Sequence, residues 1–367
     1  MGRALGSGPT PSRPRMVAVP FRCAVLIGAL IFAVPGWPAA PVPWLYEVAV
    51  PVESQSAEER RSASGNALLV LLGRLSGLAY VPRTPEIREA LASPESYYSQ
   101  FRFAVNTPGE LDLVVQFDPA PVQELIKRAQ LPIWRSVRER ALAWVVLQQA
   151  PAEGGARELL GAQAESAVVD AMQDRARARG LPLTLPLLDL EDQLNVSESA
   201  VWGRLTQVLE PAAVRYGADI VLIGRAEHRP DDSWASDWVF WIDGQEIPYS
   251  AQGADLSVQA AEVVDLLATE LAVRRAVLGR APGELLVAIS GVRSAADYGA
   301  LLGYFKGLEF VDSVGVAELN GDRLLVRLNT PASADQLLQL FGADGSLFED
   351  QLAIAPVADL SLVWRRR

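Results

Sequence analysis

The chain has 367 residues, half of them apolar, and a formal net charge of −11. Phosphate binding needs clustered lysines and arginines, but Lys127 and Lys306 are the only lysines and the arginines are interspersed with carboxylates. The composition therefore argues against a nucleic-acid partner, and the length is enough for two or three apolar cores.

Residues 1–40 have the pattern of a signal peptide. They contain four arginines and no acidic residue, an apolar run at 23–34, and small residues at Pro38-Ala39-Ala40 where a signal peptidase cuts. As a helix this run spans about 18 Å at about 1.5 Å per residue, short of the roughly 30 Å core of a bilayer. We therefore expect a cleaved leader; an uncleaved leader that anchors the protein to the inner membrane is the alternative.

Cleavage of the leader changes the chemistry of the chain. The loss of four positive charges takes the net charge from −11 to −15. Cys23, the sole cysteine, leaves with the leader, so we expect neither a disulfide nor thiol chemistry in the mature protein. These features predict an exported, periplasmic protein stabilised by its apolar cores.

An N-terminal α+β domain is predicted over residues 41–135. Ser56-Ala57-Glu58-Glu59 has the spacing of a capping box, so a helix is expected to begin there and to end near Gly77. Its leucines recur at helical spacing and predict a buried stripe of Leu68, Leu69, Leu71, Leu72 and Leu75. The other expected elements are strands at 46–52, 101–105 and 111–117, a turn at 106–109, a short helix between 82 and 94, and a helix from Pro119 after Asp118.

A central α/β domain is predicted over residues 136–280. The near-continuous apolar run 142–147 is typical of a strand buried on both faces. Asp243-Gly244 is a strong hairpin signal between two strands. The other expected elements are a helix at 156–179, a strand at 183–188 parallel to the first, a helical stretch at 201–215, a meander of strands at 218–227, 234–242 and 245–251, a helix at 256–278, and a linker at 279–283.

A C-terminal domain is predicted over residues 281–367. Asn320-Gly321 indicates a second hairpin. The expected order is a strand at 284–289, a helix at 294–308, strands at 311–319 and 323–328, a helix at 334–341 and a last strand between 352 and 363. This βαββαβ order is that of ferredoxin-like domains. The chain as a whole is therefore predicted to be α/β and α+β, with mixed sheets and packed helices.

Catalytic and metal-binding patterns are weak in this sequence. A metal site at His228 would use Glu227, Asp231 or Asp232, but the turn residues there are typical of a solvated hairpin loop. Asp189, Glu191 and Asp192 lie close together in sequence, and helix capping explains them. We predict no catalytic residue, metal ligand or cofactor. A hydrolase whose two carboxylates converge from distant positions stays an alternative.

Aromatic residues are concentrated on two neighbouring predicted strands. By strand alternation Trp234 and Trp238 share one face, and Trp241 lies on the other. One face is expected to be core. The other is a candidate partner-binding surface, since exposed aromatic residues mark interfaces. The candidate partner-binding residues are Trp234, Trp238, Trp241 and Tyr249.

Three segments carry a family resemblance: Tyr46–Val52, the helix end Leu71–Gly77, and Gly217–Arg225 followed by Trp234 to Trp241. They resemble an exported proteobacterial family known as domain of unknown function 2066, over most of the mature chain. More loosely, the first helix and the Gly-Ala-Asp-strand-Gly-Arg pattern resemble periplasmic accessory modules of the flagellar-ring and Tol-system types. These resemblances imply a binding role and name no partner.

The expected function is therefore a non-enzymatic binding or assembly-accessory module for a cell-envelope component. Docking is expected at the aromatic patch or at an exposed sheet edge. The expected partner is a cell-envelope protein, with contact to the membrane only through an uncleaved leader. The alternatives are an envelope hydrolase that uses paired carboxylates and a membrane-tethered scaffold.

Overall fold

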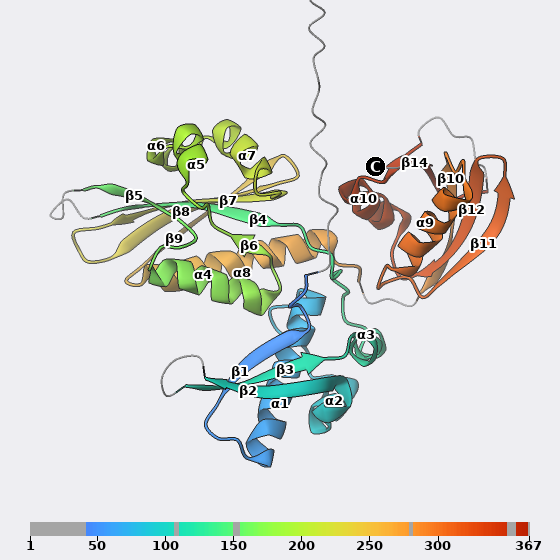
Figure 1. The fold of residues 1–367 in the computed structure, drawn as a ribbon, viewed down its shortest axis with the longest axis horizontal. Coiled ribbons are helices and arrows are strands. Elements are labelled where there is room, and N and C mark those ends of the chain that lie inside the picture. The colour runs from blue at the N-terminus through green and yellow to red at the C-terminus, as the bar shows by residue number, and fades with distance from the viewer. Residues whose placement is uncertain (1–41, 106–109, 150–154, 279–281, 351–356, 366–367) are drawn as a thin grey trace, which may run out of the picture. The chain divides into compact units, whose positions relative to one another are not determined.

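The computed structural model describes residues 42–105, 110–149, 155–278, 282–350 and 357–365. These residues belong to one compact unit and form three β-sheets (Figure 1). The predicted signal peptide, the turn at 106–109 and most of the linker at 279–283 lie outside them. Across the described part of the chain, no helix combines the length and the apolar character needed to cross a membrane.

The first sheet is antiparallel, with the strand order β1-β3-β2. Its elements are β1 (Glu47–Val52), α1 (Ala57–Ser76), α2 (Pro85–Ala92), the 3₁₀-helix η1 (Pro94–Tyr97), β2 (Tyr98–Val105), β3 (Leu111–Phe117) and α3 (Pro119–Arg128). Helix α1 packs against β1 and β3, and the Asp118 side chain caps α3 as predicted.

Helix α1 begins and ends where its sequence predicts. The Ser56 hydroxyl accepts a hydrogen bond from the Glu59 amide at 3.1 Å. At the other end Gly77 has a φ of 73°, a conformation that glycine adopts without strain. A Cβ at Gly77 would lie 2.2 Å from the Cβ of Ala272, so the glycine also permits close packing. Of the five predicted stripe leucines, all but Leu69 are fully buried: Leu68, Leu71, Leu72 and Leu75.

The second sheet is mixed, with the order β5-β4-β7-β8-β9 and a short strand β6 that also pairs with β4. Its strands are β4 (Ala141–Gln148), β5 (Arg157–Leu160), β6 (Leu183–Thr184), β7 (Ile220–His228), β8 (Trp234–Ile242) and β9 (Gln245–Gly253). Its helices are α4 (Ala167–Arg179), α5 (Leu190–Asn195), α6 (Glu198–Trp202), α7 (Thr206–Val214) and α8 (Leu256–Arg275). Strands β6 and β7 are parallel to β4.

Helices cover both faces of the second sheet. Helices α4 and α8 lie over one face, and α6 and α7 over the other (Figure 1). Their buried side chains belong to the two clusters on these faces. Strand β4 is accordingly buried almost throughout, which confirms the prediction from its apolar run. Asp243 and Gly244 have φ values of 52° and 73°, as a two-residue hairpin turn requires.

Two predicted helices of this region are wrong in part. Residues 157–160 form strand β5, paired antiparallel with β4, and helix α4 begins only at Ala167. Pairing with β4 and burial of Leu160 prevail over the helical propensity of this segment. The stretch 201–215 is not one helix, because α6 ends at Trp202 and α7 begins at Thr206. The parallel strand predicted at 183–188 is only two residues long.

The third sheet has the order β11-β12-β10-β14-β13. Its elements are β10 (Gly283–Ser290), α9 (Ala295–Lys306), β11 (Ser313–Asn320), β12 (Arg323–Thr330), α10 (Ala334–Asp344), β13 (Leu347–Glu349) and β14 (Leu360–Trp364). The βαββαβ order is confirmed, with β13 as an additional strand before β14. Strand β14 is parallel to β10. The three residues of β13 are too few to show strand alternation in the sequence.

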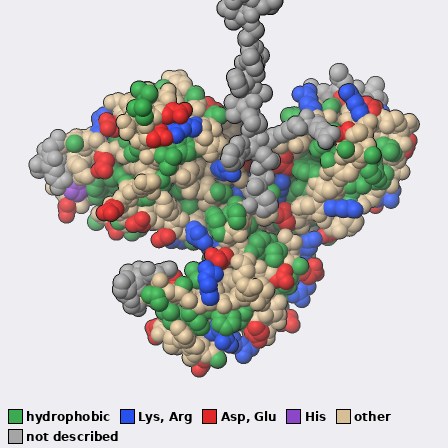
Figure 2. All heavy atoms as spheres, in the orientation of Figure 1, with side chains coloured by type: hydrophobic (Ala, Val, Ile, Leu, Met, Phe, Trp, Pro, Cys, Tyr) green, Lys and Arg blue, Asp and Glu red, His purple; other side chains and the backbone are tan. Residues whose placement is uncertain are grey.

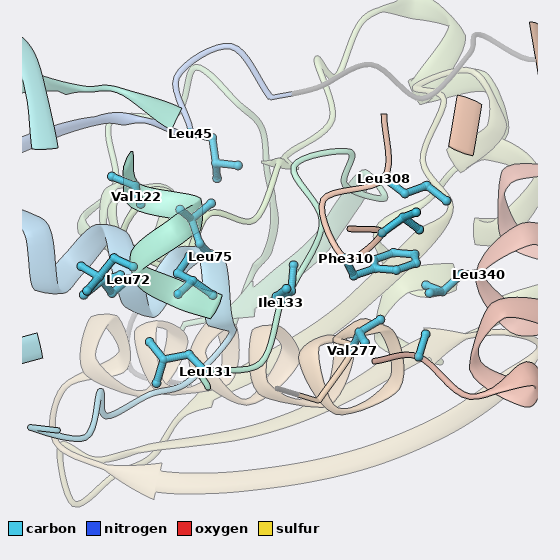
Figure 3. Packing of buried hydrophobic residues seen from close by; sticks show 14 of the residues in the cluster. Leu45, Leu72, Leu75, Val122, Leu131, Ile133, Val277, Leu308, Phe310 and Leu340 are labelled. Atoms are coloured by element: carbon cyan, nitrogen blue, oxygen red, sulfur yellow. The ribbon is translucent and has the colours of Figure 1, made fainter. Parts of the chain in front are cut away.

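Apolar side chains from distant parts of the chain form a shared core. One cluster contains leucines of α1, the segment after α3, and residues of the third sheet with its helices. Figure 3 shows Leu72 and Leu75 of α1 on the same side of the view as Leu131, with Ile133 between them and Phe310. Two further clusters fill the two faces of the second sheet.

Candidate functional site

The structure places the predicted aromatic residues on β8 and β9, on the faces that strand alternation predicts. Trp238 pairs with Tyr249 across the two strands, and these two residues and Trp234 face the core formed with α4 and α8. Trp241 faces the opposite core, beneath α6 and α7. Trp234, Trp241 and Tyr249 are half-buried. Because both faces are covered by helices, β8 has no open aromatic face.

Trp238 is a core residue. Its side chain is fully buried, and its indole Nε1 makes no hydrogen bond to any described residue. A Cβ at Gly224 would lie 2.2 Å from Cζ3 of Trp238, so the ring lies directly on the backbone of β7. Trp238 therefore presents no surface to a partner. Its inclusion among the candidate surface residues is corrected on this ground.

The turn after β7 has the geometry of a hairpin loop. His228 Nε2 lies 3.2 Å from Asp232 Oδ1, and its ring lies 4.7 Å from that of Trp234. Asp231 accepts hydrogen bonds from the amide and hydroxyl of Ser233, which lower its pKa. Within the described residues no three histidine, cysteine or acidic side chains are grouped to hold a metal ion.

The free edges of the sheets carry features that discourage strand addition. Strands β5, β6 and β13 have only four, two and three residues. Strand β2 has an irregular register between Tyr98 and Gln100, and β11 has one between Val316 and Glu318. Proline is present in each of the two remaining edge strands, as Pro51 in β1 and Pro248 in β9.

Pro248 is placed where it blocks the edge of β9. The pair Ile242 and Gln245 closes the two-residue hairpin, so hydrogen-bonded pairs recur at every second residue from Gln245. Pro248 falls at a position whose amide would point away from β8. Because proline has no N–H, an added strand would lack one hydrogen bond there. Docking at this sheet edge is therefore disfavoured.

Exposed apolar side chains gather instead on α5, on the end of α7 and on the segment before α5, beside the face of the second sheet that α6 and α7 cover. The exposed fractions are 56% for Leu187, 71% for Leu190, 76% for Leu194 and 60% for Val214. We call these four residues the α5–α7 surface. Leu190 and Leu194 are one turn apart on α5 and share a face, and α5 packs on α7. Figure 2 shows hydrophobic side chains over these helices beside acidic and basic ones.

A polar network holds the α5–α7 surface in place. Arg215, directly after α7, binds three carboxylates of α5 and its N-cap: Nη1 lies 2.8 Å from Asp189 Oδ1 and 2.9 Å from Asp192 Oδ1, and Nε lies 3.3 Å from Glu191 Oε2. The hydrogen bond from Arg215 lowers the pKa of Asp189 to about 2. Asp189 also caps α5 as predicted, through the amide of Asp192 at 3.1 Å.

Tyr216 adds a second link between the same helices. Its hydroxyl donates to Asp192 Oδ2 at 2.5 Å and accepts from the amide of Leu187 at 2.9 Å. Burial, and then this bond to Asp192, raise the pKa of Tyr216 to about 12. These bonds join the start of α5, near Leu187 and Leu190, to the residues that follow Val214 at the end of α7.

Two clefts formed by described residues lie elsewhere. A cleft of about 510 Å³ is lined by α1, α2 and the segment between them, and its lining includes Glu58, Arg61 and Arg83. A cleft of about 370 Å³ lies at the start of α10 and is lined by no acidic residue. Neither cleft brings two carboxylates together, as a glycan hydrolase would require.

Sequence reasoning missed the α5–α7 surface. It treated Asp189, Glu191 and Asp192 as helix caps, which is correct, but it did not link them to Arg215. The sequence feature that could have indicated this surface is the four-residue spacing of Leu190 and Leu194, on the face of α5 opposite to the buried Asp192. In so short a helix this spacing does not tell an exposed face from a buried one.

Comparison with known families gives one match. Residues 39–135 match the model of a domain of unknown function, DUF8605. The resemblance to domain of unknown function 2066 is therefore wrong, since the matching family is a different one. The match covers the first sheet and its helices. A search of curated proteins finds no match to this chain.

Proposed function

We propose that the protein is an exported, non-enzymatic binding protein that docks another component of the cell envelope through the α5–α7 surface. The observation that carries this proposal is the exposure of Leu187, Leu190, Leu194 and Val214 together on one network of short helices. Apolar clusters of this kind, rimmed by polar residues, mark interaction sites more often than isolated exposed side chains do.

The rigidity of this surface supports the proposal. A docking surface that is ordered before binding loses less conformational entropy when the partner arrives. The bonds of Arg215 and Tyr216 to α5 supply such order without occupying the apolar side chains. The blocked sheet edges favour docking through side chains over strand addition.

The signal-peptide pattern of residues 1–40 supports export to the periplasm. Four arginines followed by an apolar run too short to span a bilayer are typical of a signal peptide, and the partner is then a protein of the periplasm or of a membrane that faces it. Mass spectrometry of the purified protein tests this part. Loss of about 40 N-terminal residues is the expected result, and an intact leader would favour the membrane-tethered scaffold.

The docking part is tested by crosslinking in cells. A photoreactive residue is placed at Leu190 or Leu194, and at Tyr80 as a control, which is 75% exposed on the segment between α1 and α2. We expect a discrete crosslinked envelope protein from positions 190 and 194 and not from position 80. An exported, folded protein that gives no crosslink at either leucine, or the same products from all three positions, would contradict the proposal.

A further inference from the structure

The α5–α7 surface is bordered by an excess of negative charge. One guanidinium, that of Arg215, serves the three carboxylates of Asp189, Glu191 and Asp192, so the cluster keeps about two net negative charges. Glu210 adds another exposed carboxylate, one turn before Val214 on α7. The apolar residues are therefore bordered by negative potential on both helices.

This charge selects among possible partners. Nucleic acid and anionic lipid surfaces carry the same sign of charge and are repelled. A polypeptide with basic side chains is attracted, and its approach is accelerated by the negative field. Asp189 and Asp192 accept hydrogen bonds from Arg215. The charge available to a partner is therefore mainly that of Glu191, whose side chain is 64% exposed, and of Glu210.

The shape of the apolar part selects the conformation of the partner. Leu190 and Leu194 are four residues apart, about 6 Å along the axis of α5 at about 1.5 Å per residue. Val214 and Leu187 extend the apolar area toward α7. A partner helix with apolar residues at i, i+3, i+4 and i+7 presents an apolar stripe whose spacing matches that of Leu190 and Leu194. An extended strand would need a free sheet edge, and these helices have none.

We infer that the partner segment is a cationic amphipathic helix, an inference that rests on the proposed function. Its apolar side chains would contact the α5–α7 surface, and its Lys or Arg residues would lie beside Glu191 and Glu210. The apolar contact supplies most of the affinity. The charges set the association rate and the choice of partner.

The test uses two labelled synthetic peptides of about 18 residues, or five helical turns. Both have the same leucine stripe, and one has a lysine rim where the other has a glutamate rim. Fluorescence anisotropy measures their binding to the full mature protein. We expect the lysine peptide to bind at least tenfold more tightly than the glutamate peptide, with an affinity that falls as salt is added.

Variants then locate the site. Leu190→Ser with Leu194→Ser is expected to weaken binding of the lysine peptide about tenfold or more. Glu191→Gln with Glu210→Gln is expected to weaken it a few-fold and to reduce its salt dependence. Tyr80→Ser removes an equally exposed side chain elsewhere and is expected to leave binding unchanged. Circular dichroism and thermal unfolding confirm that each variant is folded.

The outcomes separate this inference from the proposed function. Equal binding of both peptides, or binding that persists in the leucine variant, would overturn the cationic helix. Crosslinks at positions 190 and 194 without any peptide binding would do the same and leave the docking proposal standing. Self-association that the leucine variant abolishes would assign the surface to a second copy of the chain. Absence of both crosslinks and peptide binding would remove the two proposals together.

Discussion

Gly224 on β7 and Trp238 on β8 are directly paired across the second sheet, and the indole ring occupies the space in which a side chain at residue 224 would lie. The close contact between the ring and the β7 backbone requires a glycine opposite Trp238, the most deeply buried tryptophan of β8. Trp238 is therefore a core residue, and a partner would have to contact other surfaces of the molecule.

Gly224→Ala is expected to destabilise the protein. The added methyl group would lie 2.2 Å from Trp238, and relief of this overlap requires movement of a fully buried ring, at a cost of about 1–3 kcal/mol or more. Gly299→Ala in α9 is the matched control, because nothing lies within 4 Å of its added Cβ. The control is expected to gain about 0.5–1 kcal/mol from helix propensity. Urea unfolding measures both, and equal stabilities would contradict the packing described.

Arg138 is expected to stabilise the end of α1. Its buried guanidinium donates to the carbonyl oxygens of Arg74, Trp134 and Arg135 and lies 3.6 Å from the centre of the Trp134 ring. Arg138→Ala would leave these oxygens without their donor, and we expect a loss of about 3 kcal/mol in the free energy of unfolding.

The control for Arg138 is Arg88→Ala, which removes an exposed arginine of α2. A change within about 0.5 kcal/mol is expected there. A tolerated Arg138→Ala substitution, with wild-type thermal and urea unfolding, would show that water replaces the guanidinium.

Truncation is expected to cost little stability on the α5–α7 surface and much more in the core beneath it. Leu194→Ala removes a side chain that is 76% exposed, so its effect on stability is expected to stay within about 0.5 kcal/mol. Leu209→Ala in α7 removes a fully buried side chain and is expected to cost about 2–5 kcal/mol. If Leu194→Ala is the more damaging of the two, the leucine is not exposed in solution.

The Arg215 cluster predicts a pH dependence of stability. The pKa of Asp189 is lowered from 3.8 to about 2 by Arg215, so its contribution is present above pH 4 and is lost as the pH falls toward 2. Asp189→Asn keeps a good helix cap and removes the charge. The variant is expected to be less stable than wild type at neutral pH, with a difference that narrows between pH 4 and pH 2.

Asp174→Asn on α4 is the control for this experiment, since it removes an exposed carboxylate outside the cluster. Its difference from wild type is expected to vary less over the same pH range. A difference at Asp189 that stays constant from pH 7 to pH 2 would show that the ion pair with Arg215 does not form.

The sequence by itself determined the features that depend on neighbouring residues. The caps of α1, the buried run of β4 and the turn at Asp243-Gly244 follow from local hydrogen bonding, periodicity and the left-handed backbone that those turn residues accept. For the same reason the βαββαβ order of the third sheet and the mixed α and β class were predictable. Asp189 as a helix cap also follows from local chemistry.

The tertiary structure decided what depends on partners distant in the chain. Residues 157–160 form a strand because β4 offers an edge, and the parallel placement of β14 depends on β10. Trp238 is buried because α8 and Gly224 enclose it. Leu190 and Leu194 are exposed because the face of α5 that is turned toward the protein carries Asp192, which bonds Arg215 and Tyr216. Alternation and helical spacing say which side chains share a face, but only the packing of other elements decides whether that face meets protein or water.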